Sequence, residues 1–230
     1  MRAKILTILA ISALATTGTG CSLKIESLLG VQDTSHLDVT LTAPIAFTAP
    51  PQPLQGGTVM DISIKVSLLD LTFGHFNGDI TVKELLIGAP GFTLPLLGNT
   101  QEICVVPSDP NNPGSGTFTA NTFRKTATFD VTTDTIALVG NPALAALLPG
   151  GGFPFPFHLQ SSVPFTLKDA LGLLSGKGSI TITQPIDQAL AFKIGSINAA
   201  GHAGGEITLA SADAFPTSPL LDSCLALIAN

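Results

Sequence analysis

Hydrophobic and polar residues alternate along several stretches of the chain, which is the pattern of β-strands with one buried face. In residues 37–47, Leu37, Val39 and Leu41 begin an apolar series that continues at every second position. Residues 60–68 repeat this alternation, and few stretches have the 3.6-residue period of a helix. The pattern predicts an all-β protein, built as a sandwich or as curved antiparallel sheets.

Short helical turns are expected in two connections. Residues 141–148 begin with Asn141 as a helix cap and Pro142 at the first helical position. Residues 166–176 form the second candidate, which Gly176 would end. Between them, residues 150–159 are expected to be extended, because each proline disfavours helical geometry in the residue before it.

Two segments far apart in the chain are alike: GHFNGDITV at 74–82 and GHAGGEITL at 201–209. In both, a glycine-rich pair stands where a two-residue hairpin turn would need positive φ angles, at 77–78 and at 204–205. The segments are therefore predicted to be hairpins. In such hairpins each histidine and the acidic residue that follows it lie on opposite faces.

The similarity extends beyond these segments and predicts two diverged repeats, residues 36–104 and 158–224, joined by a linker at 105–157. Each repeat has His-Leu, a strand with Phe-Thr, the Gly-His segment, Pro-Leu-Leu and a cysteine, in that order. Chance similarity is the alternative, because Gly, Thr and Leu are abundant in this chain. We expect residues 36–230 to form one β domain.

The N-terminal residues have the order of a secretory signal. Two cations are followed by a short apolar run and then by small residues up to Cys21, so that residues 1–20 are expected to be cleaved off. Cys21 after this run resembles the lipobox of bacterial lipoproteins. The resemblance implies that Cys21 is acylated, that residues 21–35 are a lipidated tether and, with Ser22 next, that the protein is anchored in the outer membrane. An ordinary cleaved signal is the alternative.

The remaining cysteines, Cys104 and Cys224, are expected to form a disulfide, since exported proteins meet an oxidising compartment. Two buried free thiols are the alternative. Neither cysteine has another at the spacing of a zinc site.

Composition excludes some classes of partner. Without Arg2 and Lys4, 8 basic residues stand against 16 acidic residues, a net charge of −8, which argues against binding nucleic acid or anionic lipid headgroups through a basic face. Only 11% of the residues are charged and 45% are hydrophobic, as in a folded, core-rich protein. The chain has no Trp and no Tyr, the residues that commonly stack on sugars.

Two groups of side chains are candidate sites. Phe153, Phe155 and Phe157 lie on one side of an extended ribbon, where they fill the core or line a cavity for an acyl chain or sterol. His75 and His202 would approach each other if the two repeats packed about a twofold axis, and acidic residues nearby would complete a metal site. The alternative is that both histidines lie at the surface.

No motif of nucleophilic catalysis or phosphate binding occurs in the chain. We therefore expect a non-enzymatic, lipid-anchored envelope protein, on the periplasmic face or cell surface, that binds or shields a hydrophobic molecule and needs no cofactor. The alternatives are a structural or adhesive β module that contacts other envelope proteins, and a hydrolase or metal-binding protein that uses His75 and His202.

Overall fold

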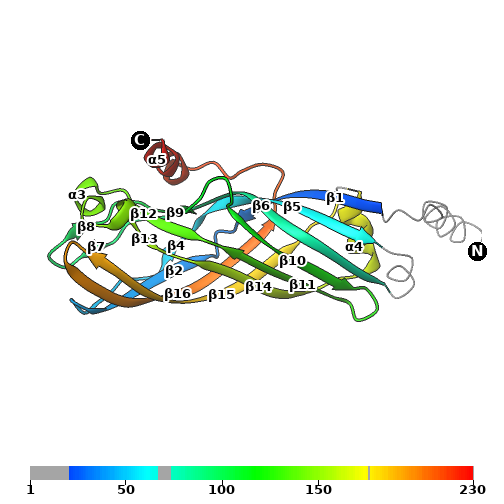
Figure 1. The fold of residues 1–230 in the computed structure, drawn as a ribbon, viewed down its shortest axis with the longest axis horizontal. Coiled ribbons are helices and arrows are strands. Elements are labelled where there is room, and N and C mark those ends of the chain that lie inside the picture. Colours follow the sequence, from blue (N-terminus) through cyan, green and yellow to red (C-terminus); the bar gives the residue numbers. More distant parts are fainter. Residues whose placement is uncertain (1–20, 67–73, 176, 230) are drawn as a thin grey trace, which may run out of the picture.

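The computed structural model describes residues 21–66, 74–175 and 177–229, and the expected signal segment lies outside them. These residues form one antiparallel sheet of fourteen strands, rolled into an elongated body, with a two-stranded ribbon and short helices near its ends (Figure 1). The predicted all-β class is confirmed, and of the two architectures expected, the structure has the curved sheet. Among the described helices, none has the length and apolar character needed to cross a bilayer.

The strands of the main sheet are β1 (Cys21–Val31), β2 (His36–Ala43), β3 (Phe47–Thr48), β4 (Gln52–Pro53), β5 (Gln55–Val66), β6 (His75–Ala89), β9 (Ile103–Pro107), β10 (Gly114–Asn121), β11 (Thr126–Thr133), β12 (Thr135–Val139), β13 (Gly152–Pro154), β14 (Phe157–Pro164), β15 (Thr181–Ile194) and β16 (Ile197–Ser211). The ribbon consists of β7 (Thr93–Leu94) and β8 (Gly98–Asn99). The helices are α3 (Pro142–Ala145), α4 (Leu167–Leu174) and α5 (Pro219–Ile228), with a 3-10 turn, η1 (Pro149–Gly151).

Two long antiparallel pairs, β5–β6 and β15–β16, form the frame of the sheet. The second edge of β6 is shared by β9 and β10, and the second edge of β16 is shared by β1 and β2. Pairing of β1 with β5 over most of its length joins the two halves. The strands β6 and β16, which carry the two Gly-His segments, therefore occupy equivalent places.

The prediction of hairpin turns inside these two segments is wrong, because both run straight through as strands. Gly78 pairs with Phe118 on one side and with Ile64 on the other, so a strand lies along both edges of β6. Gly204 likewise lies between Asp38 and Asp187. Ladders on both edges satisfy the backbone groups of an extended chain, and this outweighs the local turn preference of Asn-Gly or Gly-Gly.

The flanking segments of the predicted repeats differ in their structure. Near the start of the first repeat, β2 pairs with β16, whereas near the start of the second, β14 pairs with β11. Cys104 lies in a strand and Cys224 in a helix. The two halves are thus alike in their long strand pairs, β5–β6 and β15–β16. The division into repeats 36–104 and 158–224 stays a prediction.

Most of the segment expected to be a tether, residues 21–35, belongs to β1, which lies between β5 and β16 in the sheet. Its backbone pairs with β5 from Cys21 to Gly30, and Ile25 and Leu29 are buried. The tether prediction is therefore wrong. The apolar side chains of this segment suit a buried strand face, and its position directly after the expected signal led to the wrong interpretation.

Several local predictions are confirmed. Leu37, Val39 and Leu41 are buried along β2. Asn141 caps α3, because its side chain accepts hydrogen bonds from the backbone N–H groups of Ala143 and Leu144. The helix expected in residues 166–176 is α4, and Gly176, which was expected to end it, lies outside the described residues. A capping box of Thr166 and Asp169, which was not predicted, satisfies the first backbone donors of that helix. Helix α5 was not expected, although Ser218 and Pro219 are common residues at a helix start.

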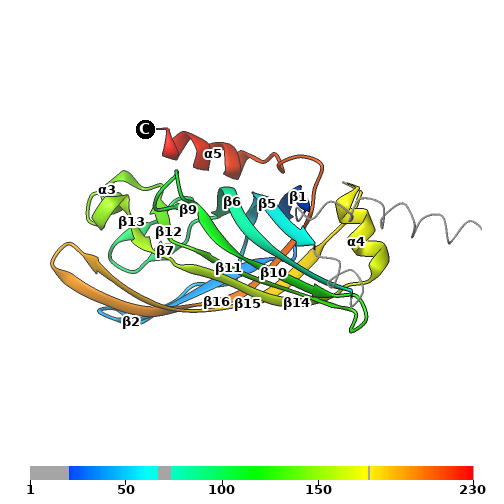
Figure 2. The ribbon, with the colours of Figure 1, turned by 45° about the vertical axis from the view of Figure 1, so that its right-hand side comes forward.

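A disulfide joins Cys104 of β9 to Cys224 of α5, with 5.5 Å between the Cα atoms. The predicted pairing is confirmed. Both cysteines are fully buried and pack with Leu86, Val106 and Leu221 in a small cluster apart from the main core. The bond thus fastens α5 against the sheet, where the helix forms a separate ridge (Figure 2).

Candidate functional site

The strongest candidate site is an apolar crevice at the end of the body that carries α3. One wall consists of Leu190, Phe192 and Ile194 on β15, together with side chains of β2. The other wall includes Leu148, after α3, and Phe153 of β13. In Figure 2 the β15–β16 hairpin and β2 curve beneath α3, β13 and β7 at this end. Strands and loops from distant parts of the chain thus converge on one apolar space.

Thr100 is the single polar residue among those that line the crevice. Its hydroxyl group donates a hydrogen bond to the carbonyl of Phe92 over 3.1 Å and accepts one from the Phe92 N–H over 2.9 Å. The Thr100 hydroxyl group thus already has hydrogen-bond partners in the backbone of Phe92. The wall offers dispersion and hydrophobic contact to a ligand, with no charged group to orient it.

The space inside the crevice is small, with a volume of about 40 Å³. Sites for drug-sized molecules have volumes of roughly 300–1,000 Å³. The side chains are thus packed nearly into contact, and a chain-like ligand would have to separate the walls. The crevice is therefore too small, as the structure has it, for a drug-sized molecule.

The three predicted phenylalanines border a series of voids. Phe153 lines the crevice and also a deeper void of about 10 Å³, which Phe155 lines as well. Phe157 lines a third void of similar size. Phe153 and Phe155 are buried in the main core, and Phe157 is half-buried. The core interpretation of the sequence therefore holds for the first two, while all three lie next to unfilled space.

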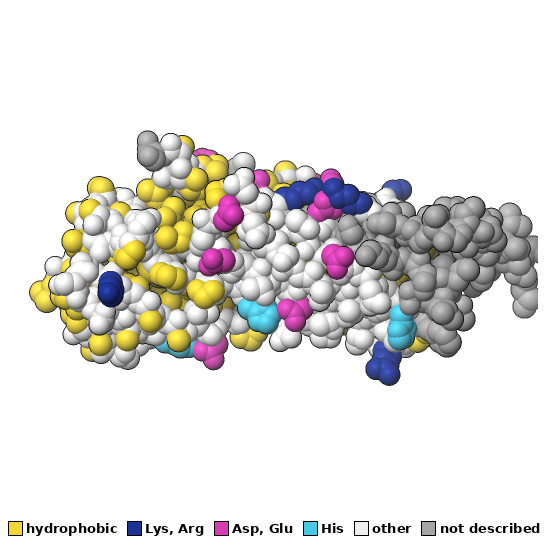
Figure 3. All heavy atoms as spheres, in the orientation of Figure 1, with side chains coloured by type: hydrophobic (Ala, Val, Ile, Leu, Met, Phe, Trp, Pro, Cys, Tyr) yellow, Lys and Arg dark blue, Asp and Glu magenta, His cyan; other side chains and the backbone are white. Residues whose placement is uncertain are grey.

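The tip of the β15–β16 hairpin closes over the crevice. The N–H of Gly195, at the turn, donates to the carbonyl of Leu147 over 2.8 Å. Leu147, in this contact, and Ile197, two residues after Gly195, are 44% and 51% exposed. Leu96, next to the crevice residue Leu97, is 95% exposed. Hydrophobic side chains gather at this end in Figure 3. The mouth of the crevice thus has an apolar rim.

The structure does not bring His75 and His202 together. His75 lies near the end of β6 that pairs with Lys65 of β5. The strand β16 pairs with β1 only from Leu29 to Val31, at the opposite end of the pairing between β1 and β5. His75 contacts the amide of Asn121 at 2.7 Å, and His202 pairs with Asp187 of the adjacent strand.

Because β6 and β16 are continuous strands, each histidine lies on the same face as the acidic residue four positions later, Asp79 or Glu206. The prediction that they occupy opposite faces is wrong. Even so, no group of three or more His, Cys, Asp or Glu side chains placed to hold a metal ion occurs in the described part of the chain. The arrangement gives no support to a metal centre.

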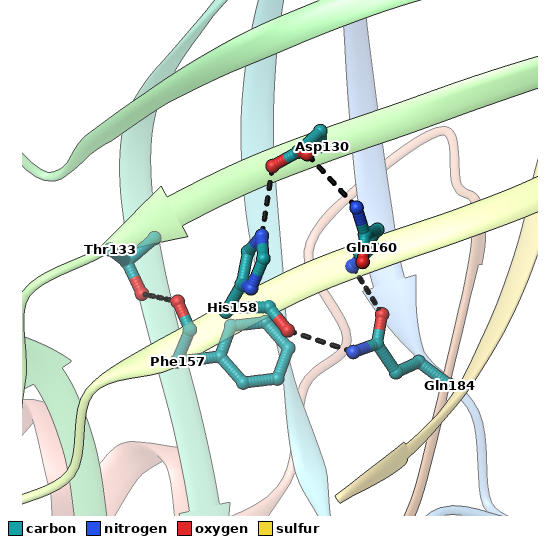
Figure 4. Close-up of polar contacts among 6 residues, drawn as sticks. All are labelled: Asp130, Thr133, Phe157, His158, Gln160 and Gln184. Carbon is teal, nitrogen blue, oxygen red and sulfur yellow. Dashed lines mark hydrogen bonds and ion pairs between the residues drawn. The ribbon is translucent and has the colours of Figure 1, made fainter.

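A second polar cluster lies where the rolled sheet meets itself, between the edges of β14 and β15 (Figure 4). The amide oxygen of Gln184 accepts from the backbone N–H of Gln160 at 2.5 Å, and its nitrogen donates to the carbonyl of His158 at 2.8 Å. Asp130 of β11 contacts His158 at 2.8 Å and accepts from Gln160 at 3.2 Å. One side chain thus links two edge strands that have no ladder between them.

The His158–Asp130 pair has the chemistry of a general base, yet both side chains are about half exposed. Among the described residues, no nucleophile is a hydrogen-bond partner of either side chain. Contacts of this kind at the surface are commonly structural. Nothing in the sequence predicts the bridging role of Gln184, because it depends on how far the sheet rolls.

Four charged residues form a network on the outer face of β1, β5 and β6. Lys24 approaches Asp61 at 2.5 Å, and Lys83 approaches Glu26 at 2.8 Å and Asp61 at 3.2 Å. Burial disfavours the charge of Asp61, but the hydrogen bonds from both lysines outweigh it and lower the pKa of that carboxyl group. Its hydrogen bond to Asp61 raises the pKa of Lys24. The two positive and two negative charges of this network balance each other, so we interpret it as a contact that stabilises the sheet.

Of these clusters, the apolar crevice is the one whose lining, position and closure suit a ligand. No protein-family model matches the chain, and no curated protein matches it at a significant level.

Proposed function

We propose that the protein binds the apolar chain of a hydrophobic molecule in the crevice at the α3 end, without catalysing a reaction. The observation that carries this proposal is a wall of apolar side chains from separate segments, in which the one polar residue, Thr100, already has its hydrogen bonds within the protein. Uncharged apolar walls favour an acyl chain or a sterol over a polar metabolite.

Opening would occur by movement of the β15–β16 hairpin. Beyond β16, β15 has no further ladder partner among the described strands, and its inner residues Leu190, Phe192 and Ile194 form one wall. At the tip the hairpin contacts the α3 segment through the Gly195–Leu147 hydrogen bond. Separation of the hairpin from α3 would join the crevice to the void behind Phe153, with Val39 and Leu190 already bordering both.

The setting of this function follows from the resemblance of the N-terminal residues to bacterial lipoproteins. Within the proposal, Cys21 carries the lipid anchor and the protein works at the outer membrane. A structural or adhesive role would use the same exposed apolar rim to contact another protein. We favour ligand binding because apolar side chains from several segments of the chain line the crevice beside this rim.

A tryptophan reporter tests the proposal, because the chain has no tryptophan of its own. Leu148→Trp places the reporter at the crevice, and Phe157→Trp is the matched control, since both positions are half-buried. Fatty acids brominated along the chain are expected to quench the Leu148→Trp protein in a saturable way and to leave the control nearly unchanged. Equal quenching of both proteins, or of neither, would overturn the proposal.

A further inference from the structure

The end of the body opposite the crevice is defined by the register of the sheet. Cys21 pairs with Val66 of β5, the neighbouring residue Lys65 pairs with β6, and β6 pairs His75 with Asn121 at the end of β10. The turn from β10 to β11, residues 122–125, is therefore at the same end as Cys21. Helix α4 lies there too (Figures 1 and 2). We call this the Cys21 end.

Large apolar side chains are exposed at the Cys21 end. Phe123, in the β10–β11 turn, is 71% exposed. Leu167 and Leu171, on neighbouring turns of α4, are 57% and 43% exposed. The α4 segment adjoins the turn, because Phe165 donates its N–H to the carbonyl of Lys125 over 2.9 Å. An aromatic ring and two leucines thus project from adjacent segments with no described part of the chain covering them.

Basic residues accompany these apolar side chains. Arg124, Lys125, Lys168 and Lys177 are exposed in the two segments 121–126 and 164–178, and Asp169 is the one acidic residue there. The chain as a whole has a net charge of −6, so these two segments differ in charge from the chain. Glu26 and Asp213 line a hollow together with Lys177, so the basic character belongs to the two segments. In Figure 3 the Lys and Arg side chains of the visible face lie mainly toward this end, with Asp and Glu side chains among them.

We propose that the Cys21 end rests on the surface of a bilayer that contains anionic lipids. Phe123, Leu167 and Leu171 enter the headgroup region, and the basic residues face the lipid phosphates. Apolar side chains beside a basic cluster are the combination that binds such interfaces. The overall negative charge makes the orientation selective, because an anionic surface repels most other faces.

The position of the chain supports a membrane as the occupant of this surface. Cys21 is at this end, and β1 is in the sheet from Cys21 onward. A lipid on Cys21 would therefore hold the Cys21 end against the bilayer without a spacer. The crevice would then open away from the membrane. The proposed contact itself does not depend on any ligand in the crevice.

Two single-tryptophan variants of the full chain test the orientation. Phe123→Trp reports on the Cys21 end, and Leu96→Trp, at a position that is 95% exposed, reports on the crevice end. Each is mixed with vesicles of phosphatidylcholine, with and without phosphatidylglycerol. We expect a shift to shorter emission wavelength for Phe123→Trp, larger with phosphatidylglycerol, and none for Leu96→Trp. A shift confined to Leu96→Trp, or no shift in either, would overturn the proposal.

The charge contribution is tested separately. Arg124→Gln combined with Lys125→Gln is expected to weaken binding to the anionic vesicles several-fold in a flotation assay. Lys193→Gln removes an exposed cation on β15, close to the crevice end, and is expected to have no effect. Equal loss in both proteins would show general charge attraction and refute the proposed orientation. Far-ultraviolet circular dichroism confirms that each variant is folded.

Discussion

The rings of Phe153 and Phe192 stack with their centroids 5.0 Å apart and their planes at 24°. This contact joins β13 to the inner face of β15, across the crevice from one wall to the other. It lies along the same hairpin as the Gly195–Leu147 hydrogen bond, so both contacts hold the crevice closed. Stacked aromatic pairs contribute about 0.5–1.5 kcal/mol beyond the area that they bury.

Phe192→Ala is expected to loosen this closure. Loss of a half-buried ring should lower the free energy of unfolding by about 1–3 kcal/mol, as measured by urea denaturation. Because the ring also fills part of the crevice, the variant should bind more N-phenyl-1-naphthylamine, a dye that fluoresces in apolar surroundings. Phe157→Ala is the control, with a similar loss of stability and no gain in dye binding. A gain of the same size in the control would contradict this role of Phe192.

The disulfide is expected to contribute much of the stability of the C-terminal helix. Its cysteines are 120 residues apart, and a crosslink over such a distance restricts the unfolded chain strongly. Replacing Cys104 and Cys224 by alanine should lower the free energy of unfolding by about 2–5 kcal/mol. Wild-type protein treated with reductant should show a loss of the same size, and the alanine variant should not respond to reductant. A response in the variant would mean that the reductant acts elsewhere.

The ion network predicts a pH-dependent stability. The pKa of Asp61 is lower in the folded protein than in the unfolded chain, where it is about 3.9. Its stabilising contribution is therefore complete above that pH and is lost as the pH falls through the lower pKa of the folded state. Asp61→Asn should cost about 1–2 kcal/mol at pH 7, since its lysine partners are partly exposed.

The difference in the free energy of unfolding between wild type and Asp61→Asn should become smaller as the pH is lowered below about 4. Urea titrations at a series of pH values measure it. Glu26→Gln serves as the comparison. Its side chain is 61% exposed, and a smaller effect is expected because water screens it. A difference for Asp61→Asn that stays constant down to pH 3 would show that the substitution acts through packing and not through charge.

Much of the fold follows from local patterns. Alternation predicted β2, Asn141 with Pro142 predicted α3, and a short segment ended by Gly176 predicted α4, because these features depend on a few neighbouring residues. The continuous strands β6 and β16 were missed for the opposite reason. Their Asn77-Gly78 and Gly204-Gly205 pairs favour turns locally, and only the strands on both edges, distant in sequence, hold them extended.

The candidate site was predictable only in part. Phe153 was identified, and the alternation of Leu190, Phe192 and Ile194 is visible in the sequence as a strand face. That these face one another across a crevice depends on the curvature of the whole sheet. Curvature accumulates from small twists over many strands, and no single residue type marks it.

The hydrogen bonds of Gln184 are expected to hold the edge strands β14 and β15 together. Gln184→Met keeps the shape of the side chain and removes both hydrogen bonds to the backbone of β14. The loss should be about 1–2 kcal/mol, and the amide proton of Gln160 should exchange faster with solvent. Gln188→Met is the matched control, because Gln188 is half-buried on the same face of β15. Among the described residues, its side chain donates only to the carbonyl of the adjacent Ala189. If amide exchange in Gln184→Met rises equally throughout the sheet, the Gln184 hydrogen bonds do not hold β14 and β15 together locally. The packing of the core alone would then keep these two edge strands adjacent.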